Sequence, residues 1–178
     1  TLYAGVDPAG LFMSDDRGAS WRDVPTLNEH ATRSAWEPSR GLFALHSICI
    51  DQRDPRHLVV AVSAGGVYCS FDAGASWSPA NGGVRAENWP DRFPVAGHNV
   101  HRVVMHPQQG RRLYRQCYNG TYRSDDGGRT WRMVLPDPAQ NTVAKAIGDH
   151  GDRVFFTDDP AYPGSGRSVT IHAIAVDE

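Results

Sequence analysis

One eight-residue pattern occurs three times in this chain and constrains its fold more than any other feature. It reads SDDRGASW at residues 14–21, SFDAGASW at residues 70–77 and SDDGGRTW at residues 124–131. All three copies fit Ser-x-Asp-x-Gly-x-Ser/Thr-Trp, and their starts are 56 and 54 residues apart. Self-similarity at a regular spacing of this size indicates a repeat architecture, in which each unit is one supersecondary element.

The segments ahead of the pattern repeat as well. HSICIDQRDPRHLVVAVS at residues 46–63 aligns with HRVVMHPQQGRRLYRQC at residues 101–117, and the first repeat joins late, with Leu2 at the position of Leu58 and Leu113. Runs of four to six residues, which alternate apolar and polar positions and are bounded by Gly, Asp and Pro, predict four short strands in each unit. Such a unit is typical of a β-propeller blade, which must pack face to face with its neighbours because it cannot bury both faces alone.

The repeats over residues 1–134 resemble a known family, the Asp-box or bacterial neuraminidase repeat β-propellers. That family includes sialidases, sortilin-like receptors and photosystem II assembly factors. The resemblance is closest to uncharacterised bacterial sialidase-like and glycosyl-hydrolase-like repeat proteins. It implies an all-β fold of about three repeats with four antiparallel strands each, which form part of a larger propeller. Fold alone does not define a function, because sites are built separately on such scaffolds.

The whole chain is interpreted as one propeller module. HAIAVDE, at its last positions, matches HSICIDQ at the first strand of the second repeat, which predicts either the first strand of a further blade or a strand that closes a ring. We favour a fragment of a larger propeller over self-association that completes a ring, because propellers have at least about four blades. The predicted parts are repeats at about 1–45, 46–100 and 101–134, an insertion or degenerate blade at 135–171, and the additional strand at 172–178.

The resemblance implies that each box is a turn between the two outer strands of a blade. The Asp can accept backbone N–H bonds as in an Asx turn, the Gly allows a positive φ, and the Trp can cover the turn. A calcium loop is the alternative, but the carboxylate spacing and terminal Glu of such a loop are missing, so we favour the structural turn and expect no metal. The structural residues are Ser14, Asp16, Gly18 and Trp21, then Ser70, Asp72, Gly74 and Trp77, then Ser124, Asp126, Gly128 and Trp131.

Composition narrows the classes of partner. The chain has 178 residues and a net charge of -2, which provides no general attraction to nucleic acid or anionic membranes. It has no apolar run long enough to span a bilayer and no signal peptide at its first residues, so its compartment is left open between the cytoplasm and export through a signal outside the chain. Cys49, Cys69 and Cys117 form no metal-binding spacing and are expected to be buried free thiols. We expect no cofactor.

Two long connections, residues 22–45 and 78–100, are the candidate binding elements. Each contains a Trp near a carboxylate and an arginine, an arrangement in which the ring can stack on a sugar while charged groups bind its hydroxyls or acid group. The alternative is that each Trp only anchors its own loop. The candidate ligand-binding residues are Trp36, Arg40, Trp89 and Arg92, and the candidate catalytic acids are Glu37, Glu87 and Asp91, although nothing in the sequence pairs these acids.

His46, His101 and His172 occupy the same position at the start of three predicted inner strands. They could line one axis as a polar ring for a ligand, which makes His46 and His101 further candidate ligand-binding residues, or as a three-imidazole metal site. We favour a third interpretation, in which each imidazole bonds to the backbone of a neighbouring blade.

The sequence therefore predicts a propeller module that binds a glycan or other polymer through its long loops. A sialidase-like glycoside hydrolase and a protein-interaction scaffold are the alternatives. The sialidase arginine triad is not visible, which leaves catalytic activity open. The expected partners are a glycan or polymeric ligand and either the remaining propeller blades or a second copy of the chain.

Overall fold

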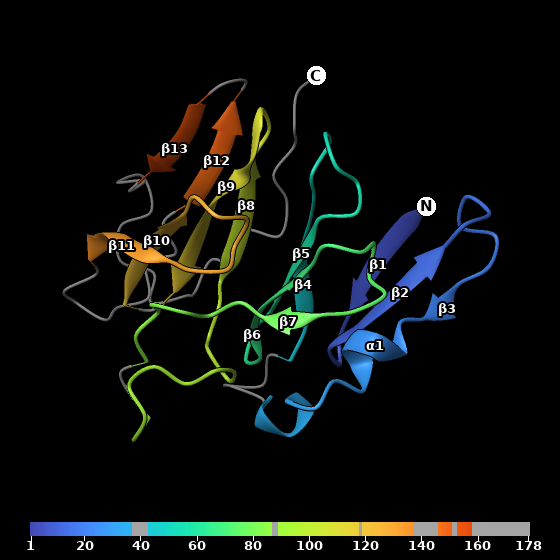
Figure 1. Ribbon diagram of the computed structural model, residues 1–178, viewed down its shortest axis with the longest axis horizontal. Helices are drawn as coiled ribbons and strands as arrows, with labels where there is room; N and C mark the ends of the chain where they lie inside the picture. The colour runs from blue at the N-terminus through green and yellow to red at the C-terminus, as the bar shows by residue number, and fades with distance from the viewer. Residues whose placement is uncertain (37–42, 87–88, 118, 137–145, 151–152, 158–178) are drawn as a thin grey trace, which may run out of the picture.

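The computed structural model describes residues 1–36, 43–86, 89–117, 119–136, 146–150 and 153–157. Within them the chain forms antiparallel sheets that stand side by side, from the blue sheet on the right of Figure 1 to the yellow and orange sheet on the left. In the three larger sheets, strands pair in the order in which they occur in the sequence. This arrangement confirms the predicted all-β propeller architecture. The three sheets are called blades 1, 2 and 3.

Blade 2 is the most completely buried sheet. It contains β4 (Leu45–Ile50), β5 (Leu58–Val62), β6 (Gly66–Ser70) and β7 (Ser78–Pro79). All five positions of β5, which reads LVVAV, are buried because both faces of the sheet are covered by neighbouring blades. The expected alternation of apolar and polar residues is therefore wrong for this strand.

Blade 3 contains β8 (Arg102–His106), β9 (Gln109–Cys117), β10 (Gly120–Ser124) and β11 (Arg132–Pro136). Its second strand has nine residues, which is longer than the four to six expected. The additional residues pair because the chain turns back at once after β8, with His106 opposite Gln109.

Blade 1 has three strands, β1 (Leu2–Val6), β2 (Gly10–Ser14) and β3 (Arg22–Asp23). Its β1–β2 pair has the register of β5–β6 and of β9–β10, because Leu2, Leu58 and Leu113 each lie opposite the Ser that opens a box. Equivalent residues of the three blades therefore point to equivalent faces of their sheets.

The cores lie between the blades. One apolar cluster joins blades 1 and 2 through residues that include Leu11, Leu27 and Leu58, and a second joins blades 2 and 3 through residues that include Val59 and Leu113. The first strands of the blades contact one another in the order β1, β4 and β8. Face-to-face packing therefore buries both faces of blade 2, as expected for a repeat that cannot form a core alone.

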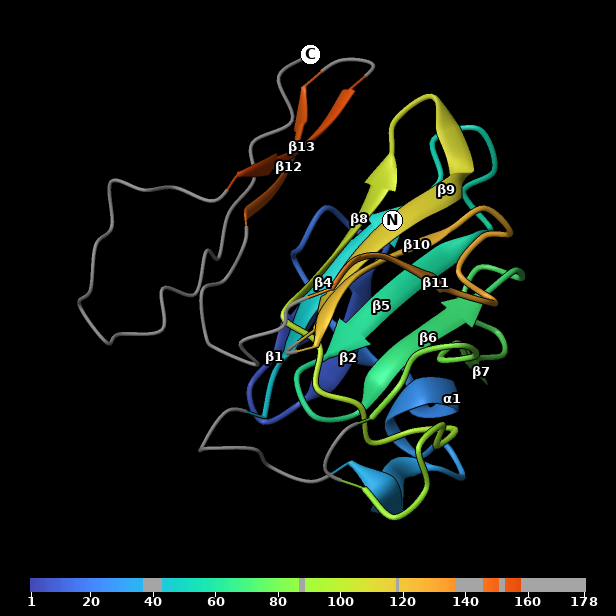
Figure 2. The ribbon, with the colours of Figure 1, turned by 90° about the vertical axis from the view of Figure 1, so that its left-hand side faces the viewer.

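A separate hairpin follows blade 3. It consists of β12 (Ala146–His150) and β13 (Arg153–Thr157), and β12 contacts β8. Figure 2 shows this hairpin on the side of β8 that faces away from blade 2. The strand predicted at residues 172–178 lies outside the described residues.

Two short helical segments occupy the first long connection, α1 (Pro25–Asn28) and the 3-10 turn η1 (Arg33–Ala35). Pro25 suits the first turn of α1, where no backbone donor is needed. In the described part of the chain, neither helical segment approaches the length and apolarity needed to cross a membrane.

Candidate functional site

The carboxylate of each box is held inside its own turn. In the first box, Asp16 accepts hydrogen bonds from the Ser20 backbone N–H at 2.9 Å and from the Ser20 and Ser14 hydroxyls. Asp72 and Asp126 make the same set of bonds. These donors lower the pKa of Asp16 and Asp72 to about 2, with the hydroxyls of Ser20 and Ser76 as the largest cause.

Two consecutive residues of each turn adopt the left-handed conformation. Gly18, Gly74 and Gly128 have φ of +89°, +87° and +92°, and the residue before each glycine also has a positive φ. The conformation explains the glycine, and the hydrogen bonds explain the Asp. Across the described residues, no group of three His, Cys, Asp or Glu side chains is placed to hold a metal ion.

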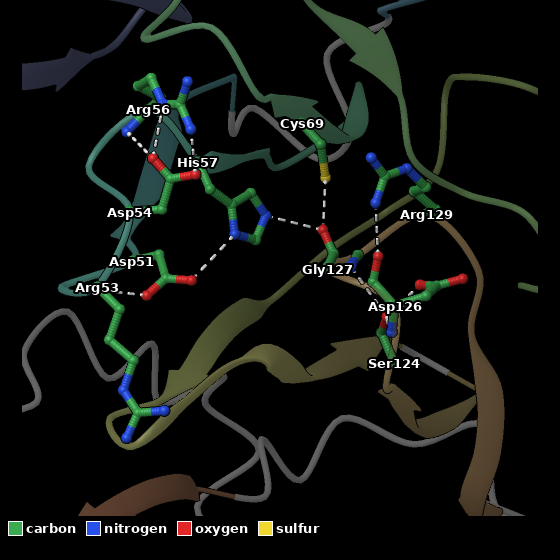
Figure 3. A network of polar contacts seen from close by, with 11 residues as sticks. Asp51, Arg53, Asp54, Arg56, His57, Cys69, Ser124, Asp126, Gly127 and Arg129 are labelled. Atoms are coloured by element: carbon green, nitrogen blue, oxygen red, sulfur yellow. Dashed lines mark hydrogen bonds and ion pairs between the residues drawn. The ribbon is translucent and has the colours of Figure 1, made fainter.

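The box turns also bind the blade before them. Figure 3 shows the third turn, where the Gly127 carbonyl accepts a hydrogen bond from Nε2 of His57 at 3.0 Å and a contact from the Cys69 thiol at 3.4 Å. His57 stacks on Phe71 with centroids 4.6 Å apart, and the Arg129 guanidinium lies 3.7 Å from the Phe71 centroid. Phe71, which replaces the extra Asp of the other boxes, therefore links two successive turns.

The two long connections converge on one face of the molecule. Gly97 of the second connection donates its N–H to the Gly65 carbonyl at 3.0 Å, and the Trp36 ring of the first connection covers Gly65. The Ala35 carbonyl lies so close to Gly97 that a side chain there would need it to shift. Both connections thus meet at the turn between β5 and β6.

Trp36 is a buried anchor of its connection. Its side chain is 5% exposed, its Nε1 donates to the Tyr68 hydroxyl at 2.6 Å, and the Arg33 guanidinium lies 4.4 Å from its ring centroid. Because these neighbours cover the ring, the expectation that Trp36 is exposed to stack on a ligand is wrong. The tight packing against Gly65 holds it in place.

Trp89 is different, because its side chain is 37% exposed. The edge of its ring rests on Gly97, and the loop beside it is ordered by the Phe93 N–H, which donates to Asp91 at 2.9 Å, and by the Ala86 N–H, which donates to the Arg92 carbonyl. Asp91 and Arg92 are exposed, and so are Phe93 and Val95 at 59% and 66%. This segment, residues 89–95, is called the Trp89 loop.

Two of the three candidate acids, Glu37 and Glu87, lie outside the described residues, and so does the candidate ligand-binding residue Arg40. Asp91 uses one oxygen for the turn of its own loop.

His46 connects two blades. Its Nε2 donates to the Val100 carbonyl ahead of β8 at 3.0 Å, while Nδ1 lies 2.8 Å from the Ser47 hydroxyl. This geometry agrees with the interblade role we favoured. His101 directly precedes β8 and is partly buried, and this burial lowers the pKa of its imidazole. His172 lies outside the described residues, so the proposed ring of three imidazoles is not tested.

Sequence reasoning missed a polar network between blades 2 and 3. Arg115, in the middle of β9, is fully buried and donates to Asn81 Oδ1 at 2.6 Å and to the Cys117 sulfur at 3.0 Å. Asn81 also bonds to both backbone groups of Val67 and to the Val95 carbonyl, which ties it to the Trp89 loop. The sequence indicates this network only weakly. Arg115 stands where the second repeat has Val60, but one arginine among seventeen is not distinctive.

A groove of about 240 Å³ lies between the inner strands β4 and β8. Its walls include Ile48, Ile50 and Val104, with Arg102 and His106 as its basic side chains. It is a second concave surface, on a part of the structure distinct from the Trp89 loop.

The sheets and the long-loop face define a class of protein, a β-propeller repeat protein. Within this class the chain belongs to the Sortilin-Vps10 family (sortilin, neurotensin receptor 3), whose model matches residues 9–177. Two curated sequences of the xyloglucanase Xgh74A of Acetivibrio thermocellus are each 27% identical over 154 residues. They match 77% of this chain, and the chain spans only 16% of their length.

Solved structures with similarity include an ancestral GH74 enzyme, at 18% identity and a TM-score of 0.42, covering 63% of this chain and 12% of that one. The GH74 xyloglucanase of Xanthomonas campestris has 22% identity and a TM-score of 0.40, covering 83% and 29%. YCF48 from Cyanidioschyzon merolae has 17% identity and a TM-score of 0.30, covering 80% and 54%.

Proposed function

We propose that this chain binds a neutral glycan through the Trp89 loop, and that the ligand is a polysaccharide of the xyloglucan class. The observation that supports the proposal best is the half-exposed Trp89 ring, held on Gly97 where the two long connections meet. The curated relatives named as xyloglucanases indicate the ligand class.

The chemistry of the loop suits a sugar surface. An indole ring held at one edge keeps its orientation, so stacking a pyranose on its exposed face costs little conformational entropy. Phe93 provides a second exposed aromatic ring four residues further on. Asp91 and Arg92, between the two rings, present groups that can bond to sugar hydroxyls.

Binding can be measured by isothermal titration of the chain with xyloglucan oligosaccharides. We expect Trp89→Ala to weaken binding by at least about tenfold, since loss of a stacked aromatic anchor costs roughly 2 kcal/mol or more. The matched control is Trp21→Ala, because Trp21 is 46% exposed in a turn far from the loop along the chain. Unchanged affinity after Trp89→Ala, or no binding by the parent chain, would refute the proposal.

Hydrolysis is the second candidate, favoured by the glycoside hydrolase relatives alone. Asp91 is the candidate acid that the structure describes, and it is exposed beside Trp89. Release of reducing ends from xyloglucan by the parent chain, abolished by Asp91→Asn, would support it. Binding without release in the same preparation would leave the glycan-binding function and exclude hydrolysis.

A further inference from the structure

The buried Arg115 occupies a position that packing between blades does not explain. The shared register places Val60 of blade 2 and Ala4 of blade 1 at the equivalent position, so a blade forms without a charge there. Burial of a guanidinium is costly unless its donors are used. Among the described residues, no carboxylate forms an ion pair with Arg115, and its Nη2 has no hydrogen-bond acceptor. The charge therefore needs a reason other than packing.

Arg115 determines how the Asn81 amide is oriented. Its Nη1 donates to Oδ1 of Asn81 at 2.6 Å, and the Val67 N–H donates to the same oxygen at 3.0 Å. A guanidinium has no acceptor, so it can face only the oxygen of an amide. Nδ2 of Asn81 must then point the other way, where it donates to the Val67 carbonyl at 3.3 Å and to the Val95 carbonyl at 2.8 Å. Arg115 thus fixes the amide that holds the Trp89 loop.

Blade 1 contains an equivalent asparagine without the arginine. Asn28 accepts a hydrogen bond from the Leu11 N–H and donates one to the Leu11 carbonyl, both at 2.9 Å. In the core between blades 1 and 2, Val60 takes the place of Arg115. Asn28 makes its further bond to Asp23, within its own connection. The pairing of an asparagine with a strand is therefore a feature of the repeat, whereas the guanidinium and the bond to a following loop distinguish the interface between blades 2 and 3.

Two consecutive carbonyls at the end of the Trp89 loop point inward, although the Val95 side chain is 66% exposed. The Val95 carbonyl accepts the Asn81 bond, and the Pro94 carbonyl bonds to Nε2 of His98 at 2.7 Å. His98 is 3% exposed, and burial, together with the charge of Arg115, lowers the pKa of its imidazole to about 4. Both anchors of the loop end therefore lie under the influence of one guanidinium.

We propose that Arg115 and Asn81 are positioning residues of the Trp89 loop, which hold the loop end so that the Trp89 ring keeps one orientation. The edge of this ring rests on Gly97, two residues after the carbonyl that Asn81 binds. A loop that samples other orientations binds with an affinity reduced by the fraction of competent molecules. The effect on affinity rests on the proposed glycan-binding function, whereas the order of the loop does not.

The alternative is that Arg115 only stabilises the interface between blades 2 and 3. The two roles differ in the amides that they protect from hydrogen exchange. Loss of a stabilising residue accelerates all amides that exchange through global unfolding, whereas loss of a positioning residue accelerates those that exchange through local opening of the loop. The N–H groups of Phe93 and Gly97 report on the loop, because they bond to Asp91 and to the Gly65 carbonyl.

Hydrogen–deuterium exchange with mass spectrometry of the parent chain and of Arg115→Met tests the proposal. Met keeps an unbranched side chain but has no donor for the Asn81 amide. We expect the amides of residues 93–97 to exchange at least about tenfold faster in this variant, and those of β5 to change far less. The matched control is Val60→Ala at the equivalent position of blade 2, in which the loop amides should exchange as in the parent chain. No acceleration of the loop, or equal acceleration of the loop and β5, would overturn the proposal.

Asn81→Asp is a second variant that does not depend on the folding of Arg115→Met. The carboxylate keeps an acceptor for Arg115 and for the Val67 N–H, and it forms an ion pair with the guanidinium, but it removes the donor to the Val95 carbonyl. We expect the same acceleration of residues 93–97 while the slow amides of blades 2 and 3 stay protected. Loop amides that exchange as slowly as in the parent chain would contradict the proposal.

Titration with xyloglucan oligosaccharides separates this inference from the proposed function. We expect Arg115→Met to weaken binding by about three- to tenfold, less than Trp89→Ala, because the ring is retained and only its orientation is released. A parent chain that binds no glycan refutes the proposed function but leaves the exchange result as the test of the loop anchors. Unchanged affinity in a variant whose loop exchanges faster would overturn the positioning role.

Discussion

The three box tryptophans form a natural series for measuring what blade packing contributes. Trp21, Trp77 and Trp131 have the same position in the same turn, but their exposed fractions are 46%, 6% and 5%. Replacing a buried Trp by Ala typically costs 3–5 kcal/mol of unfolding free energy, so we expect roughly that loss for Trp77→Ala and Trp131→Ala. Trp21 is covered only by its own turn, and Trp21→Ala should cost about 1 kcal/mol.

Substitution by Phe separates the hydrogen bond from the packing. Nε1 of Trp131 donates to the buried Ala80 carbonyl, whereas Nε1 of Trp77 is buried without an acceptor among the described residues. Trp131→Phe leaves that carbonyl unsatisfied, but Trp77→Phe removes a donor that was already unsatisfied. We therefore expect Trp131→Phe to cost about 1–2 kcal/mol more than Trp77→Phe.

The assay is urea unfolding followed by far-ultraviolet circular dichroism, with unfolding free energies compared at equal slope. The order of the Ala variants tests the interblade packing, and the difference between the Phe variants tests the hydrogen bond. The reasoning is refuted if Trp21→Ala destabilises as much as Trp131→Ala, or if the two Phe variants have equal stability.

Two further predictions concern the box turns. Because the folded chain holds the pKa of Asp16 and Asp72 at about 2, their contribution to stability is present above about pH 4 and is lost as the pH falls toward 2. The urea midpoint of Asp72→Asn should therefore fall less steeply across this pH range than the midpoint of the parent chain. Parallel curves for the two proteins would contradict the assignment. Gly127→Ala should cost about 1–3 kcal/mol, since Gly127 has a φ of +80° and a Cβ there would lie 3.2–3.3 Å from His57 and Phe71. The cost should be smaller in a Phe71→Ala background, and strict additivity in thermal unfolding would show that the ring contact is not the cause.

The blades were predictable because their signals are local. Asp16 accepts hydrogen bonds from Ser14 and Ser20, and Gly18 adopts a left-handed conformation within the same turn, so eight residues specify the complete box turn. The spacing of the three copies then defines the sheets. Strand pairing between neighbours in the sequence requires no long-range information beyond that spacing.

The candidate site was predictable only in part. Trp36 and Trp89 have similar surroundings in the sequence, but one is a buried anchor and the other is exposed. Two glycines far from these tryptophans in the sequence decide the difference. Gly65, in the turn between β5 and β6, admits the Trp36 ring at close range, and Gly97 admits the Ala35 carbonyl and the edge of the Trp89 ring. No pattern in either loop reports this contact.

The sequence by itself determined the repeat, the turns and the register of the strands, because these depend on bonds between residues a few positions apart. Only the tertiary structure decided which side chains the blades cover. Trp21 and Trp131 are equivalent in sequence, yet the neighbouring blade makes one an exposed surface and the other a core residue. Burial depends on what lies opposite a face, and that is a property of the assembled sheets.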